Sequence, residues 1–285
     1  MNLDGLLPRL RWLLAAGERR QYKTIVKALP QLIEDRRFDE IERILVSCGS
    51  FQVASNFKDM VDVFQTNGDS FSKIVEIGTF NFASSTLINS LKPKKASFYG
   101  FDNWDLGGTG ARLTAEWRSR CFPNCRVVSG HPLSSSMEIK DLYDTELLVI
   151  DGNHSFRATL ADCGCFDVLK DGATVFFHDC GLGNRVWGCF WVYYLLYKYG
   201  VVKPLDNRFD GWIRDVDSRR KPAVNPGEKP EIEFAIGRFN KNNYADCRHL
   251  LSDPALLWEE VRIRFAMRSG LDMTAQSYLW KEWFG

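Results

Sequence analysis

Residues that can bind a ligand or move a proton follow four short apolar segments of the sequence. Carboxylates accept hydrogen bonds from hydroxyls or hold a cation, imidazole transfers protons near neutral pH, and glycine lets a ligand approach the backbone. Each residue by itself could be only a turn or a helix cap. Their repeated position after apolar segments instead predicts a ligand site. They are Gly78 after 73–77, Asp102 after 97–101, Asp151 after 147–150, and His178 with Asp179 after 173–177.

The four apolar segments are typical of strands buried in a parallel sheet, and helical patterns alternate with them. This alternation predicts an α/β fold with a doubly wound, mostly parallel, Rossmann-like sheet of seven strands. The remaining strands are expected at 126–129, 201–205 and 231–239. Because ligands bind beyond the carboxyl ends of the strands in such sheets, the residues named above should share one edge.

Helical additions are expected at both ends of this sheet. Pro30 should interrupt one of the N-terminal helices, and the glycine-rich stretch 106–110 should form a mobile loop. The N-terminal helices could cover a substrate, form a homodimer or only pad the fold, and the sequence leaves this open. The expected divisions are an N-terminal helical segment at 1–67, a Rossmann-like domain at 68–240 and a C-terminal helical extension at 241–285.

Composition argues against several partners. The chain has 285 residues, with 37 Lys and Arg against 36 Asp and Glu, so no overall field attracts nucleic acid or an anionic membrane. The longest apolar run, 189–197, is too short to span a bilayer. The eight cysteines lack the spacing of a zinc ribbon, which favours reduced thiols and a cytoplasmic location. No nucleic acid and no membrane are therefore expected as partners.

Four motifs together resemble a known family. They are Glu76-Ile77-Gly78-Thr79, Asp102, Asp151-Gly152-Asn153-His154, and His178-Asp179. Their order is similar to that of class I S-adenosylmethionine-dependent methyltransferases, in the small-molecule and sugar O-methyltransferase branch with Asp-Gly-x-His and His-Asp motifs. The resemblance covers about residues 70–180 and extends more loosely to 240.

The resemblance implies S-adenosylmethionine as cofactor and a hydroxyl of a small molecule or sugar as methyl acceptor. Asp102 would accept hydrogen bonds from the ribose hydroxyls. Phe82 and Ala83 stand where the family commonly has a second glycine. The residues expected to bind the cofactor are Glu76, Gly78, Thr79, Phe80, Ser84, Asp102, Asn103, Trp104, Gly130, His131 and Asp151.

Two routes remain open for removing the hydroxyl proton. His178 or His154 could be the catalytic base, with Asp179 as an orienting group. In metal-dependent relatives, Mg²⁺ or another divalent cation lowers the pKa of the hydroxyl, and here Asp151, Asp179 and His178 would hold it. Cys180 departs from that pattern, because it replaces an oxygen ligand.

Two other functions remain as alternatives. The chain could be a non-catalytic methyltransferase-like module that binds a partner through its helical ends. It could also methylate protein or nucleic acid, although its balanced charge speaks against nucleic acid.

Overall fold

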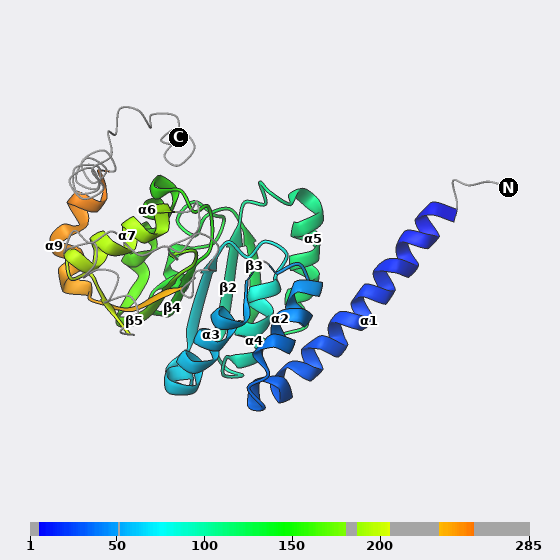
Figure 1. Ribbon diagram of the computed structural model, residues 1–285. Coiled ribbons are helices and arrows are strands. Elements are labelled where there is room, and N and C mark those ends of the chain that lie inside the picture. Colours follow the sequence, from blue (N-terminus) through cyan, green and yellow to red (C-terminus); the bar gives the residue numbers. More distant parts are fainter. Residues whose placement is uncertain (1–5, 51, 181–186, 206–233, 254–285) are drawn as a thin grey trace, which may run out of the picture. The chain divides into compact units, whose positions relative to one another are not determined.

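The computed structural model describes residues 6–50, 52–180, 187–205 and 234–253 (Figure 1). By their contacts, the residues divide into two compact units. The first unit draws on residues 1–70, 80–95 and 104–126, and the second on residues 71–79, 96–103 and 127–285. The predicted boundaries after residues 67 and 240 stay a prediction.

A seven-stranded sheet in the order β3-β2-β1-β4-β5-β7-β6 confirms the predicted fold class. β1 pairs in parallel with β2 and β4, and β4 pairs in parallel with β5. β7 pairs antiparallel with β5 and β6. The strands are β1 (Lys73–Ile77), β2 (Ser97–Asp102), β3 (Cys125–Ser129), β4 (Thr145–Ile150), β5 (Leu169–Phe177), β6 (Val202–Pro204) and β7 (Ala235–Phe239).

Aromatic side chains fill the core of the second unit. The ring of Phe166 packs edge-on against Phe177, Phe239 and Tyr244, and the buried Tyr193 hydroxyl donates to the Ile236 carbonyl at 3.0 Å. Burying such large side chains supplies much of the favourable free energy of folding. The helices of this unit are η3 (Ile139–Leu142), α6 (Phe156–Asp162), η4 (Cys163–Val168), α7 (Trp187–Lys198) and α9 (Lys241–Leu251).

The first unit is helical, and its longest helix corrects a prediction. α1 continues through Pro30, which therefore does not interrupt it. Pro30 is exposed while Leu29 is buried, so water can bond the carbonyl that proline leaves unpaired. Tyr22 anchors α1 through a 2.7 Å hydrogen bond to Thr86. The helices are α1 (Leu6–Glu34), α2 (Phe38–Ser47), α3 (Ala54–Asn67), η2 (Gly68–Ser70), α4 (Ala83–Leu91) and α5 (Gly108–Ser119).

The glycine-rich stretch is not the predicted loop throughout. α5 begins at Gly108, so only the first two residues of 106–110 lie outside the helix. Gly108 N–H donates to the Trp104 carbonyl at 2.8 Å. Gly108 and Gly110 fall in the first helical turn, where N–H groups lack intrahelical partners in any sequence. The predicted loop is therefore limited to residues 106 and 107, and the mobility of the stretch stays a prediction.

Two parts of the predicted organisation lie outside the described residues: the beginning of the last predicted strand, at 231–233, and the C-terminal extension from residue 254. Among the helices that the structure describes, none is long and apolar enough to cross a membrane.

Gly78 closes the turn after β1, at a position with no room for a side chain. Its φ is +91°, and a Cβ there would lie 1.9 Å from the Asp151 carbonyl oxygen. Gly78→Ala should therefore destabilise the protein by more than about 3 kcal/mol, measured by urea unfolding, or prevent folding. Gly172→Ala is the control, because φ there is +75° but no atom lies within 4 Å of the added Cβ. Its cost should be only about 1–2 kcal/mol; equal costs would contradict the proposed clash.

Candidate functional site

Backbone hydrogen bonds beyond the strand ends hold the predicted site residues at one edge of the sheet. Each bond joins the exit of one strand to its neighbour, so five exits form a continuous row. The predicted placement of Gly78, Asp102, Asp151 and His178 along this edge agrees with the row. The bonds are His178 N to Ile150 O at 3.0 Å, and Asp151 N to Ile77 O, Gly78 N to Phe101 O and Gly130 N to Asp102 O, each at 2.8 Å.

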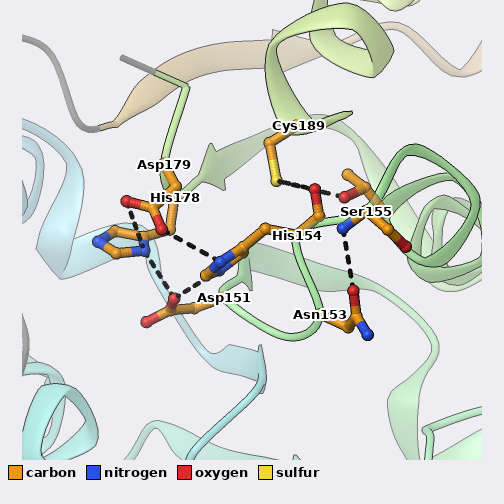
Figure 2. Close-up of polar contacts among 8 residues, drawn as sticks. Asp151, Asn153, His154, Ser155, His178, Asp179 and Cys189 are labelled. Carbon is orange, nitrogen blue, oxygen red and sulfur yellow. Dashed lines mark hydrogen bonds and ion pairs between the residues drawn. The ribbon is translucent and has the colours of Figure 1, made fainter. Parts of the chain in front are cut away.

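Two histidines and two aspartates form a cluster after β4 and β5 (Figure 2). Asp151 Oδ1 lies 2.8 Å from His178 Nδ1 and 3.3 Å from His154 Nε2. The other nitrogen of His154, Nδ1, lies 3.1 Å from Asp179 Oδ2. A longer contact of 3.6 Å joins His178 Nδ1 to Asp179 Oδ1. We call these four residues the His–Asp cluster.

The turn between β4 and α6 presents His154 to the cluster. Ser155 is the N-cap of α6, and its Oγ accepts from the Ala158 N–H at 3.3 Å. Its own N–H donates to Asn153 Oδ1 at 2.9 Å (Figure 2). Such caps fix the direction in which the chain enters a helix. The ring of His154 is therefore placed by a turn with its own hydrogen bonds.

Gly188 of α7 supports the same turn and was missed by the sequence analysis. A Cβ at Gly188 would lie 2.4 Å from the His154 carbonyl oxygen and 2.3 Å from the Phe156 nitrogen. Only glycine lets the helix backbone approach so closely. A lone glycine within an aromatic helix was the signal in the sequence.

Asp179 turns back toward His154 through an unusual backbone conformation. Its φ is +54°, in the left-handed region that aspartate tolerates better than most residues. Strained conformations of this kind gather at functional sites. The neighbouring Cys180 is buried, and burial raises the pKa of its thiol well above the usual value. Cys180 is therefore a neutral thiol at physiological pH.

The cluster is shielded but reachable from solvent. The exposed fraction of the side chains rises from 7% for His178 to 24% for His154. Burial opposes the charge of Asp151, but the His178 and His154 rings outweigh it and hold the pKa of that carboxyl well below its usual range. The two rings therefore favour the anionic form of Asp151.

The other predicted cofactor residues of the second unit lie at the β1, β2 and β3 exits. Glu76 and Thr79 are buried, Asp102 is half-buried and Asn103 is exposed. Gly130 has a φ of +97°.

His131 is held at both ring nitrogens. Nε2 lies 3.3 Å from Asp162 Oδ1, and Nδ1 accepts from the Leu133 N–H at 3.3 Å. Burial raises the pKa of Asp162. The sequence analysis did not single out Asp162, although a carboxylate in the apolar segment 156–169 was a visible signal.

Three predicted cofactor residues belong to the first unit. Trp104 is buried, and its Nε1 donates to the Phe80 carbonyl at 2.9 Å. Ser84 is buried in the first turn of α4. Phe82 packs against Phe122, with ring centroids 6.1 Å apart. The expected place of the family's second glycine is thus a core position of the helical unit.

A comparison with protein families matches residues 75–180 to a methyltransferase domain, Methyltransf_24. This segment is similar to methyltransferase domains. The predicted resemblance to class I S-adenosylmethionine-dependent methyltransferases is confirmed, and the matched segment contains Gly78, Asp102 and the whole His–Asp cluster. No curated protein matches the chain.

Solved structures similar to the chain include three O-methyltransferases. CalS11, a TDP-rhamnose 3'-O-methyltransferase of calicheamicin biosynthesis, is 14% identical, with 75% of this chain and 92% of that chain covered and a TM-score of 0.46. TomG of Streptomyces achromogenes, from tomaymycin synthesis, is 12% identical, with 67% and 82% covered and a TM-score of 0.41. An O-methyltransferase of Bacillus cereus is 12% identical, with 58% and 80% covered and a TM-score of 0.42.

The lowered pKa of Asp151 predicts an acid-dependent loss of stability. A folded-state pKa below the unfolded value gives stability that is present above the unfolded pKa and is lost as the pH falls. In the presence of a chelator, the free energy of unfolding should therefore decrease once the pH falls below about 4. Asp151 should account for up to about 2–3 kcal/mol of this decrease. Urea unfolding of Asp151→Asn should show a shallower acid slope. Asp141→Asn, at an exposed position of η3, is the control, and an unchanged slope in Asp151→Asn would contradict the prediction.

Proposed function

We propose that the chain transfers a methyl group from S-adenosylmethionine to a hydroxyl of a small molecule or sugar. The observation that carries this proposal is the His–Asp cluster within a methyltransferase domain, on the edge of the sheet where ligands of open α/β folds bind. Two imidazoles beside two carboxylates are suited to handling the proton that a hydroxyl acceptor must lose.

The exits of β1, β2 and β3 offer groups that fit the cofactor. Asp102 can accept hydrogen bonds from ribose hydroxyls, and its backbone carbonyl is already bonded to Gly130. Thr79 Oγ1 is buried without a hydrogen-bond partner among the described residues. Because buried hydroxyls are normally hydrogen-bonded, a polar group of a bound ligand is a suitable partner for it.

Methyl transfer is a displacement at carbon. The bond from the methyl carbon to the sulfonium sulfur breaks, a bond to the acceptor oxygen forms, and the hydroxyl proton must leave. Alignment of oxygen, carbon and sulfur supplies much of the rate. His154 Nε2 can assist in one of two ways that use the same lone pair: it can accept the proton, or it can help to hold a cation that lowers the hydroxyl pKa.

The net charge and the shielded position of the cluster support a small acceptor. A formal net charge of +1 offers little long-range attraction to nucleic acid. The cluster side chains are at most 24% exposed, which suits a small acceptor that enters the site. A cytoplasmic location and a homodimer through the terminal helices stay predictions.

Cofactor binding tests the first half of this proposal. Asp102→Asn removes a charge-assisted hydrogen bond to ribose, worth roughly 1.5–3 kcal/mol, and should raise the calorimetric Kd for S-adenosylmethionine about tenfold or more. Asp144→Asn is the matched control, because Asp144 is exposed and precedes β4 at the amino end of that strand. Equal affinities for Asp102→Asn and the unchanged chain would place the ribose elsewhere. Absence of cofactor binding by the unchanged chain would favour a non-catalytic module.

A methyl-transfer screen tests the second half. Sugars, phenols and other hydroxyl compounds would be supplied with S-adenosylmethionine carrying a labelled methyl group. His154→Ala should lower the rate on any accepted compound roughly 10²–10⁴-fold, while S-adenosylmethionine affinity stays unchanged. His249→Ala, on the exposed face of α9, serves as control. Transfer at full rate by His154→Ala would remove the His–Asp cluster from the reaction.

A further inference from the structure

Three side chains of the His–Asp cluster converge closely enough to share one metal ion. Asp151 Oδ1 lies 2.8 Å from His178 Nδ1 and 3.3 Å from His154 Nε2. One ligand atom from each of these residues lies within 4.8 Å of the other two. Ligands about 2.1 Å from a common ion lie roughly 3.0–3.5 Å apart. Small side-chain rotations would therefore be enough to bind an ion.

The fourth residue, Asp179, has a different position. Its Oδ2 lies 3.1 Å from His154 Nδ1, whereas His154 Nε2 is directed to Asp151 (Figure 2). Metal-binding histidines commonly donate their second ring N–H to a carboxylate, which fixes the tautomer and the ring orientation. Asp179 fits this orienting role, because it contacts the nitrogen that an ion bound at Nε2 would leave free to donate.

The donor atoms distinguish between classes of divalent cation. Magnesium prefers oxygen ligands in a strict octahedron and keeps several waters. Two imidazoles and one carboxylate are instead typical of first-row transition metals such as iron, cobalt and zinc. Cys180, where metal-dependent relatives have another oxygen ligand, is a buried cysteine and supplies no oxygen.

We propose that Asp151, His154 and His178 bind a first-row transition-metal ion, that Asp179 orients His154, and that magnesium is not the ion of this site. The role of the ion rests on the proposed function, in which its charge would lower the pKa of the acceptor hydroxyl. Compared with the set expected from the sequence, His154 enters the ligand set and Asp179 leaves it.

Metal binding to the free protein tests this proposal without any methyl transfer. The full chain, stripped with chelator and free of cofactor and acceptor, would be titrated calorimetrically with Co²⁺, Zn²⁺ and Mg²⁺. One equivalent of Co²⁺ or Zn²⁺ should bind, and Mg²⁺ should bind at least about 100-fold more weakly. NMR of the Co²⁺ form should show two exchangeable, contact-shifted imidazole N–H signals, from His154 and His178. Binding of Mg²⁺ as tight as that of Co²⁺, or no Co²⁺ binding, would overturn the proposal.

Variants assign the roles of the individual residues. His154→Gln and His178→Gln should each lose one shifted signal and weaken Co²⁺ binding at least about 100-fold. Asp179→Asn should keep both signals, move that of His154, and weaken binding only about 10–100-fold. His249→Gln, on exposed α9, should leave Co²⁺ affinity unchanged. Circular dichroism and thermal unfolding of each variant would verify the fold.

Two results would contradict these roles. Unchanged Co²⁺ affinity in a folded His154→Gln would remove His154 from the ligand set, and disappearance of the His154 signal in Asp179→Asn would make that aspartate more than an orienting group. Titration of S-adenosylmethionine into the same stripped protein separates the two proposals. Cofactor binding without Co²⁺ binding would overturn the metal site alone, and the reverse would overturn the proposed function alone.

Discussion

The close approach of two backbone segments at the ends of β1 and β4 is the constraint on which the site depends. At Gly78 a single missing methyl group lets the Asp151 carbonyl lie where a Cβ would otherwise be. The same contact lets Asp151 N–H donate to Ile77 and Gly78 N–H donate to Phe101. Three neighbouring strands thus continue their pairing beyond the regular sheet. The residues that follow these strand ends are therefore held at fixed distances from one another.

Electrostatic interactions determine how the side chains of the His–Asp cluster are arranged. Two carboxylates placed side by side would repel each other, but each contacts an imidazole ring. Burial penalises every charge in the cluster, so opposite charges must be close if both are to persist. This balance lowers the pKa of Asp151. The two carboxylates of the cluster therefore place negative charge where a cation or a proton can neutralise it.

The sequence predicted the sheet well because apolar segments of four or five residues indicate buried strands directly. It also predicted which residues follow the strands, since parallel strands end at one edge. Pro30 was misread because its breaking effect depends on exposure, which the sequence pattern does not show. The division of roles between His154, Asp179 and Asp151 was beyond reach as well. Ring orientation there depends on the Ser155 cap and on Gly188, which is 34 residues away from His154.

Gly188 also limits how this site can be redesigned. Because its backbone lies so close to the His154 carbonyl, α7 and the β4–α6 turn cannot move independently of each other. The following residues of α7 are large and fully packed, among them Tyr193 and Tyr194. A substitution meant to turn His154 toward a new acceptor would therefore have to move an aromatic helix with it. The proposed acceptor preference is therefore easier to change at residues outside this backbone contact than at the histidine itself.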